Sequence, residues 1–320
     1  MNPRLAAIAD AQHGPFTRAQ ALACGLSDDE LRHLVRVREL RRLRRGAYVQ
    51  QQRYDRLDAV GRHVLRAHAV GLSLEDRTAF SHVTAAALHG LVLWDVDLSL
   101  VHVTRLDTGA ARRCAGVDHH AGMIDAAEVV RVCGLPAVHP ARAVVEVALT
   151  SGLEASVVAA DSALRRRLAT KPELDRLFGE MRLWPCSGSA GRVISFADGL
   201  SESVGESRAR VLFARQGLPV PVLQREIVDE AGRFVARVDF LFEDERVVVE
   251  FDGDVKYRGT GVDPSDVVIA EKRREDRLRE LGYEVVRVTW SDLAQPERTA
   301  RRILAAFARN RTRSRHPRTA

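Results

Sequence analysis

The sequence contains few cysteines, few lysines and no long apolar run. Its four cysteines are far apart and form no Cys-x-x-Cys pair, which excludes a zinc ribbon and a disulfide framework and favours a reducing compartment. The stretches free of charge are shorter than the roughly 20 apolar residues that span a bilayer. Asp10 and His13 interrupt the place where a signal peptide needs its apolar segment. We therefore expect a cytoplasmic protein with no membrane segment.

The basic residues are almost all arginines, and they are unevenly distributed. The 320 residues are enough for about two or three domains at roughly 150 residues each. The net charge is +6, but residues 31–45 hold seven arginines and one acid, and residues 298–320 hold eight arginines and no acid. Two basic segments on an otherwise acidic chain indicate nucleic acid as a partner. Residues 310–320 are also typical of a disordered, solvated tail.

Residues 1–52 predict a winged helix-turn-helix domain. We expect a helix over 4–12, a short helix over 18–23 capped by Thr17, and a third helix opened by the capping box Ser27-x-x-Glu30. Two short helices across a tight turn that contains glycine are typical of a helix-turn-helix. Residues 40–49 alternate and turn like a small β-hairpin, which would form the wing.

The arginines of this domain are the candidate contacts to DNA. Arg32 and Arg36 would be exposed opposite the apolar stripe of the third helix, and the hairpin is basic. Arginines on such a helix can reach base edges and phosphates, whereas a basic wing contacts the backbone. A helical protein-interaction domain with a charged face is the alternative. The candidate DNA-binding residues are Arg32, Arg36, Arg41, Arg42, Arg44 and Arg45.

This region resembles the N-terminal domain of AbiEi-type antitoxins, which are transcriptional autorepressors of type IV toxin–antitoxin systems. The resemblance rests on Phe16-Thr-Arg-Ala-Gln-Ala to Gly25-Leu-Ser and on Arg44-Arg-Gly-Ala-Tyr-Val. The segments SHVTAAALHGL, VHVT and GLPAVHPARAVVEVA extend it to about residues 5–150. Ala143 and Glu146 stand where the family pattern has Thr and Asp. The resemblance implies DNA as a partner and a cognate toxin.

Residues 53–184 predict a mixed middle region. We expect helices over 55–72, 81–90, 138–149, 153–167 and 172–181, and a strand over 98–104. Eight of the eleven histidines lie between His63 and His139, but their spacings match no metal-binding motif. We therefore predict core or capping histidines here. Residues 185–200 begin with a stretch rich in Ser and Gly and predict a linker.

Residues 201–309 predict an α/β domain in the order helix, three strands, helix, strand. The helices are expected over 206–216 and 271–281, and the strands over 223–228, 234–242, 247–251 and 283–289. A hairpin with its tip at 244–245 sets Asp239 directly opposite Glu250. One face of the hairpin would then be apolar, formed by Val238, Phe240, Phe242, Val247, Val249 and Phe251.

The other face of this hairpin would bring carboxylates together. Like charges directly opposed across a hairpin are destabilising, and acids that follow a buried run are unusual without a partner. A divalent cation held by Asp239, Glu250 and Asp252 would explain them, and carboxylate ligands indicate Mg²⁺ or Mn²⁺. The alternative is an ordinary polar face on which Arg237 pairs with Asp252.

The segment from about Glu202 to Arg302 resembles the PD-(D/E)XK nuclease superfamily, in particular domains related to very-short-patch-repair (Vsr-like) endonucleases. The resemblance implies a restriction-endonuclease-like fold in which a bound metal activates a water for phosphodiester hydrolysis. It rests on Glu206, Arg237-Val-Asp239-Phe, Val249-Glu250-Phe-Asp252-Gly253, Glu271-Lys272-x-x-Glu275-Asp276-x-Leu278-Arg279 and Arg287-Val-Thr-Trp290.

The resemblance also assigns roles to individual residues. Asp239 and Glu250 would hold Mg²⁺, and Glu206 would assist. In the family pattern a lysine follows the glutamate by two residues, but here Asp252 occupies that position. Lys256 is the nearest lysine, and it could orient or deprotonate the water instead. Two alternatives stay open: Glu206 completes the capping box Ser203-x-x-Glu206, and Lys256 is a phosphate contact or simply exposed.

The sequence as a whole predicts a multidomain α/β (α+β) protein with three parts. These are a winged helix-turn-helix, a mixed helical middle region and a restriction-endonuclease-like αβββαβ domain. The expected function is that of a DNA-binding protein with a metal-dependent phosphodiesterase domain. The alternatives are an AbiEi-like antitoxin and repressor whose nuclease fold is inactive, and a protein-binding scaffold.

Overall fold

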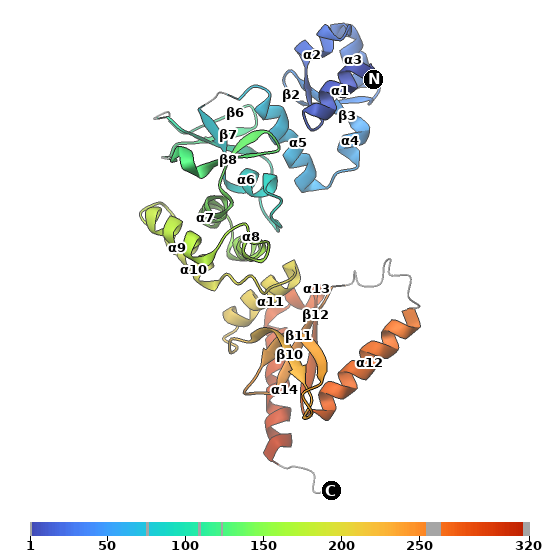
Figure 1. The fold of residues 1–320 in the computed structure, drawn as a ribbon, viewed down its shortest axis with the longest axis vertical. Helices are drawn as coiled ribbons and strands as arrows, with labels where there is room; N and C mark the ends of the chain where they lie inside the picture. The colour runs from blue at the N-terminus through green and yellow to red at the C-terminus, as the bar shows by residue number, and fades with distance from the viewer. Residues whose placement is uncertain (1, 75–76, 108–109, 123, 254–263, 316–320) are drawn as a thin grey trace. The chain divides into compact units, whose positions relative to one another are not determined.

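The computed structural model describes residues 2–74, 77–107, 110–122, 124–253 and 264–315. The chain divides into two compact units, Met1–Ala197 and Asp198–Ala320, and Figure 1 shows their helices and strands. Both units mix α and β structure. Among the described residues, no helix combines the length and the apolar character needed to cross a membrane.

Unit 1 begins with the helices and the hairpin that the sequence predicts. Thr17 and Ser27 both accept the backbone N–H three residues further on, so each opens its helix with a capping box. The small core contains Leu5, Phe16 and Leu31. Three short strands form a sheet in the order β1-β3-β2. The elements are α1 (Pro3–Ala11), β1 (Phe16–Thr17), α2 (Arg18–Ala23), α3 (Asp28–Arg36), β2 (Leu40–Arg44) and β3 (Ala47–Gln50).

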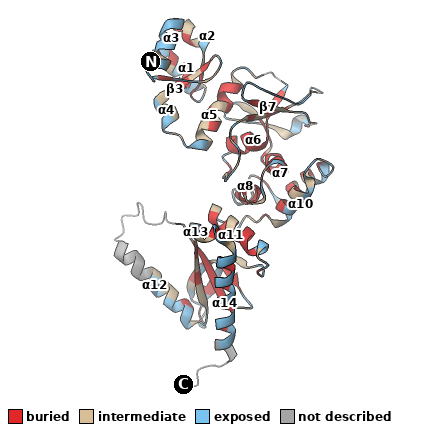
Figure 2. Ribbon diagram, turned by 180° about the vertical axis from the view of Figure 1, so that it is seen from behind, coloured by how far each residue is buried: buried red, intermediate tan, exposed pale blue. Residues whose placement is uncertain are grey.

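The rest of unit 1 is a six-stranded sheet covered by helices. Its strand order is β6-β7-β5-β4-β9-β8. The strands are β4 (Thr78–Phe80), β5 (Val101–Arg105), β6 (Arg112–Cys114), β7 (Val117–His120), β8 (Val129–Val132) and β9 (Leu135–Val138). The helices are α4 (Gln51–Asp55), α5 (Ala59–Gly71), α6 (His82–Leu88), α7 (Pro140–Thr150), α8 (Leu153–Arg165), α9 (Lys171–Glu180) and α10 (Ser187–Phe196). In Figure 2, α6, α7 and α8 are largely buried.

The predicted helices of this region are present, whereas only one of its strands, β5, was expected. Two antiparallel pairs, β6–β7 and β8–β9, are each joined by two residues. Both joints have positive φ at both residues: Ala115 and Gly116 in the first, Cys133 and Gly134 in the second. Such turns match the twist of a hairpin. The strands are too short for their alternation to stand out along the sequence.

The linker predicted over 185–200 is wrong for most of its length. Residues 187–196 form α10, which packs against α7, α8 and α9, and the units divide after Ala197. Ala190, Val193 and Ile194 are buried at helical spacing and hold α10 in place. Gly191 contributes to this packing, because a Cβ there would come within 2.8 Å of the Phe178 ring.

Unit 2 has the predicted order of helix, three strands, helix and strand. Its sheet has the order β10-β11-β12-β13, in which β12 and β13 are parallel and the other neighbours are antiparallel. The elements are α11 (Val204–Arg215), β10 (Val222–Val228), β11 (Phe234–Phe242), β12 (Val247–Asp252), α12 (Pro264–Glu280), β13 (Glu284–Thr289), α13 (Trp290–Leu293) and α14 (Pro296–Arg315).

The C-terminal basic segment is helical where a disordered tail was predicted. Helix α14 continues to Arg315 and packs against β12 and β13. The amide of Asn310 donates to the backbone oxygen of Glu245 at 2.9 Å, and Arg311 forms an ion pair with the same glutamate. Arg302 and Arg309 also form ion pairs within unit 2. Residues 316–320 lie outside the described residues.

The register predicted for the β11–β12 hairpin is confirmed from Phe240 opposite Val249 to Phe242 opposite Val247. The predicted pairing of Asp239 with Glu250 lies just beyond this ladder and stays a prediction. The prediction of one continuous apolar face on β11 is wrong. Phe240 packs beneath α11 and α14, whereas Val238 belongs to a second cluster with Val248 and with Leu278 of α12. Asp239 lies between the two, and its carboxylate accepts the backbone N–H of Phe251 at 2.9 Å. The sheet is thus covered on both faces.

Candidate nucleic-acid interface and carboxylate site

Two of the six candidate arginines line one groove on the N-terminal domain. Arg32 projects from α3 and Arg42 from β2, and they share a cavity of about 450 Å³ with Asp28 and Tyr48. Arg42 lies opposite Tyr48 in the β2–β3 ladder, so its side chain is on the side of the hairpin that faces α3. A groove between a helix and a basic hairpin offers two guanidinium groups to one ligand.

The other candidate arginines point elsewhere. Neighbouring residues of a strand face opposite sides, and the guanidinium of Arg41 accordingly lies over the Tyr54 ring, 4.0 Å from its centroid. A β-bulge follows Arg42, and Arg44 then donates to the Ser73 hydroxyl at 3.5 Å. Arg36 and Arg45 are exposed. The structure therefore brings Arg32 and Arg42 together and separates Arg41 and Arg44 from them.

Acidic residues at the start of α3 partly neutralise this groove. Asp28 forms an ion pair with Arg18, and Asp29 forms one with Arg32. The hydrogen bond from Arg18 lowers the pKa of the Asp28 carboxyl. Arg18 was absent from the predicted set because it lies outside the basic segment 31–45. Its position as the first residue of a capped helix was the available signal.

In unit 2, Glu206 and Asp239 are joined by one amide group. Gln224 of β10 donates from Nε2 to Glu206 Oε2 at 2.9 Å and to Asp239 Oδ1 at 3.4 Å. Ser203 caps α11, since its Oγ accepts the Glu206 N–H at 3.1 Å. The predicted capping box is incomplete, because the Glu206 carboxylate instead accepts from the Glu202 N–H and the Ser203 hydroxyl, each at 2.8 Å. Glu206 thus supports the start of α11 and also lies beside Asp239.

Glu250 is held by an arginine that the sequence analysis did not single out. Arg274 of α12 forms an ion pair with Glu250 and also contacts Glu271 at 3.2 Å. The same guanidinium donates to the backbone oxygen of Arg237 at 3.1 Å. Glu250 is 9% exposed, so its charge requires such a partner. Arg274 could have been found from its position on the charged helix that covers this face of the sheet.

The remaining predicted residues of this site are more peripheral. Asp252 is half-buried at the end of β12, opposite Thr289 of β13. Arg237 does not take the role suggested for it as a partner of Asp252, because it pairs with Glu202 at 2.9 Å. Lys256 lies outside the described residues, so its predicted role in activating water stays a prediction.

Burial makes the carboxyl groups of Glu206 and Glu250 weaker acids. It raises the pKa of Glu206, and the nearby charge of Asp239 adds to that effect. Burial also raises the pKa of Glu250, although Arg274 acts in the opposite direction. An incoming cation at Glu250 would meet the Arg274 guanidinium, which already supplies the positive charge. The carboxylates of Glu206, Asp239 and Glu250 all accept hydrogen bonds from other groups of the chain.

Residues 3–49 match a family model described as "Transcriptional regulator, AbiEi antitoxin". The uncharacterized proteins Rv2248 and MT2308, from two strains of Mycobacterium tuberculosis, are each 33% identical over 230 residues, covering 71% of this chain and 80% of their own. The crystal structure of the RV2827C protein from Mycobacterium tuberculosis covers 70% of this chain and 87% of its own, with 15% identity and a TM-score of 0.38. The predicted AbiEi resemblance is confirmed over 3–49, and the nuclease resemblance stays a prediction.

Proposed function

The chain belongs to the same family as protein Rv2248 of Mycobacterium tuberculosis, and we propose that it is a DNA-binding transcriptional regulator of the AbiEi antitoxin type. The observation that carries this proposal is the coincidence of two features in residues 3–49. These residues match the regulator model, and they present Arg32 and Arg42 in one groove between α3 and the hairpin. This favours the regulator over the nuclease as the main function.

The arrangement of α3 and the hairpin supports a winged helix that reads DNA. Helix α3 would lie in the major groove and the β2–β3 hairpin would contact the backbone beside it. The ion pair between Arg32 and Asp29 is no obstacle, because both side chains are more than three-quarters exposed. Exposed ion pairs of this kind contribute little to stability. A DNA phosphate can therefore replace Asp29 as the partner of Arg32.

The experiment that tests this is DNA binding by the full chain. The probe is the duplex upstream of the chain's own gene, with an unrelated duplex of equal length as competitor. We expect Arg32→Ala/Arg42→Ala to weaken binding at least tenfold, at a cost of about 1–3 kcal/mol per lost base or phosphate contact. Arg176→Ala is the matched control, since Arg176 is an exposed arginine of α9. Equal affinity of the double variant and the control would refute the proposal.

A toxin partner is part of the same proposal. AbiEi-type antitoxins imply a cognate toxin, and a nucleotidyltransferase-like gene beside this one would supply it. Co-expression should then relieve the growth arrest that the neighbouring gene causes alone. Growth arrest that persists with the full chain present would refute the antitoxin activity. The DNA-binding activity is tested separately by the binding experiment above.

A second candidate function, metal-dependent DNA cleavage, is favoured by one observation. Glu206, Asp239 and Glu250 come from three elements of a domain with the αβββαβ order, and the charge of Asp239 acts on both glutamates. Mg²⁺ would require Arg274 to leave Glu250. A plasmid-nicking assay with Mg²⁺ or Mn²⁺ tests this, with Asp239→Ala as the inactive variant. Nicking that is absent from the wild type, or retained by Asp239→Ala, would exclude it.

A further inference from the structure

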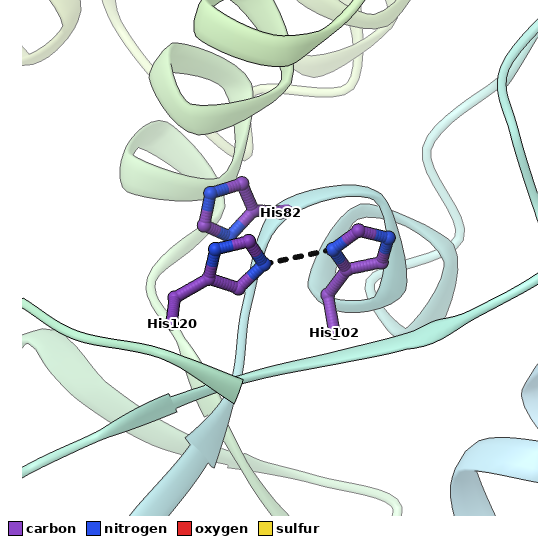
Figure 3. A group of neighbouring side chains, drawn as sticks. All are labelled: His82, His102 and His120. Atoms are coloured by element: carbon purple, nitrogen blue, oxygen red, sulfur yellow. Dashed lines mark hydrogen bonds between the residues drawn. The ribbon is translucent and has the colours of Figure 1, made fainter. Parts of the chain in front are cut away.

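Three histidines that are distant in the sequence meet in unit 1. His82 opens α6, His102 lies in β5 and His120 ends β7. The parallel β5–β7 register pairs His102 with Asp118 and Thr104 with His120. Both histidines therefore project from the same face of two neighbouring strands, towards the start of α6. Figure 3 shows the three imidazole rings side by side.

The rings are close enough to share a ligand. Each offers a nitrogen, and these nitrogens all lie within 4.8 Å of one another. His102 Nδ1 and His120 Nε2 are 2.9 Å apart, and the rings of His82 and His120 are stacked with centroids 3.8 Å apart. In a tetrahedral zinc site with bonds of about 2.0–2.1 Å, ligand atoms are separated by roughly 3.4 Å.

We propose that His82, His102 and His120 bind one divalent transition-metal ion of the zinc type. Imidazole nitrogen is a good ligand for Zn²⁺ and its neighbours in the first transition row, whereas Mg²⁺ and Ca²⁺ prefer oxygen. The bound ion would tie α6 to strands β5 and β7. Binding would break the hydrogen bond between His102 and His120, and the ring that donates it would carry its proton on its other nitrogen instead.

A second layer of polar groups supports the first of these ligands. His82 Nδ1 lies 3.0 Å from the Ser81 hydroxyl and 3.4 Å from Glu146 Oε2, which leaves Nε2 for the ion. Glu146 is itself held by Arg142 at 2.9 Å. A carboxylate behind a metal-binding imidazole fixes the tautomer and the orientation of the ring. The same carboxylate accepts the backbone N–H of His82 at 2.9 Å.

The backbone at His82 is also strained. Its φ is +52°, a left-handed conformation that is uncommon for a residue with a side chain. Strain of this kind persists where the surrounding structure enforces it, and such residues cluster at functional sites. His82 is 5% exposed, so the protein holds an imidazole in a costly backbone conformation beside two others.

The protonation state of the rings suits a metal. Burial lowers the pKa of His82 well below its usual value and lowers that of His102 to about 4. Burial also lowers the pKa of His120. A metal ion binds the unprotonated nitrogen of a neutral imidazole, which burial favours here. The side chain of Asp118, nine-tenths buried, supplies negative charge next to them.

The test is zinc binding by the full chain without a polyhistidine tag, after treatment with a chelator. Calorimetry and elemental analysis should find one zinc ion per chain. We expect His102→Gln and His120→Gln to lower the affinity more than about 100-fold, because loss of a ligand exceeds the 10–100-fold effect of an outer-shell partner. His89→Gln is the control, since His89 is half-buried and donates its Nε2–H to the Val138 carbonyl at 2.8 Å instead.

A measurement on the wild type keeps the proposal testable if a variant fails to fold. Nitrogen-15 spectra of the eleven histidine rings should show three that change on addition of Zn²⁺. Co²⁺ in place of zinc should give the visible absorption of a tetrahedral nitrogen site. The proposal would be overturned by a wild type that binds no stoichiometric zinc, by unchanged binding in both ligand variants, or by a zinc response confined to other histidines.

Discussion

Arg274 donates to both carboxylate oxygens of Glu250, from a helix to a strand 24 residues earlier in the chain. Glu250 is the residue that the nuclease resemblance assigns to a metal ion. The guanidinium thus takes the position at which a cation would act, and it satisfies a carboxylate that burial would otherwise penalise. This relationship favours a binding or structural role for unit 2 over cleavage.

The first prediction concerns this ion pair. Arg274→Met should lower the free energy of unfolding by about 2 kcal/mol, because it leaves a mostly buried carboxylate without its cation. Arg279→Met is the control, since Arg279 forms a surface pair with Glu275 and should change stability by less than about 0.5 kcal/mol. Urea unfolding of the two variants measures both values, and equal effects would contradict the structural role of Arg274.

The second prediction concerns two glycines in helices. A Cβ at Gly205 would lie 1.9 Å from the Phe251 ring, whereas a Cβ at Gly179 would have nothing within 4 Å. Gly205→Ala should therefore destabilise the chain by about 1–3 kcal/mol or more, through overpacking next to Glu206. Gly179→Ala should stabilise it by about 0.5–1 kcal/mol. Thermal unfolding should show shifts of opposite sign, and shifts of the same sign would count against this packing.

The third prediction concerns pH. Burial lowers the pKa of His68 to about 4, and His13 and Arg53 contribute in the same direction. The unfolded chain binds this proton near the ordinary value of 6.5, so the folded state is favoured above pH 6.5 and loses that advantage as the pH falls towards 4. The loss is about 3 kcal/mol for one histidine over this range.

The variant that checks it is His68→Phe, which keeps an aromatic ring against His13 and removes the titration. Unfolding free energies measured between pH 7.5 and 4.5 should fall less steeply than in the wild type. His33→Phe replaces an exposed histidine and should leave the slope unchanged. A His68→Phe slope equal to that of the wild type would show that His68 already titrates normally in the folded state.

The fourth prediction distinguishes two neighbouring arginines of β2. Arg42 lines the groove with Arg32, whereas Arg41 lies over Tyr54. Arg42→Ala should lower the slope of log K against log salt by about 0.9, the value for one lost phosphate contact. Arg41→Ala should change it less. DNA binding measured from low to physiological salt checks this, and a larger change for Arg41→Ala would assign the contact to the other side of the hairpin.

Several features of the protein followed from local sequence alone. The caps at Thr17, Ser27 and Ser203 depend on side chains that reach a backbone N–H three residues away. The register of Phe240 with Val249 follows from a hairpin tip at residues 244–245. Interactions between residues that are close together in the sequence can be predicted from the sequence itself.

The sequence did not show which residues of distant elements come into contact. His102 and His120 are adjacent only because β5 and β7 pair in parallel, and their spacing along the chain matches no metal motif. Arg274 reaches Glu250 only because α12 covers that face of the sheet. Strand order and helix placement are set by the packing of the whole unit. The amino-acid sequence determined which residues could carry chemistry, and the tertiary structure decided which of them come together.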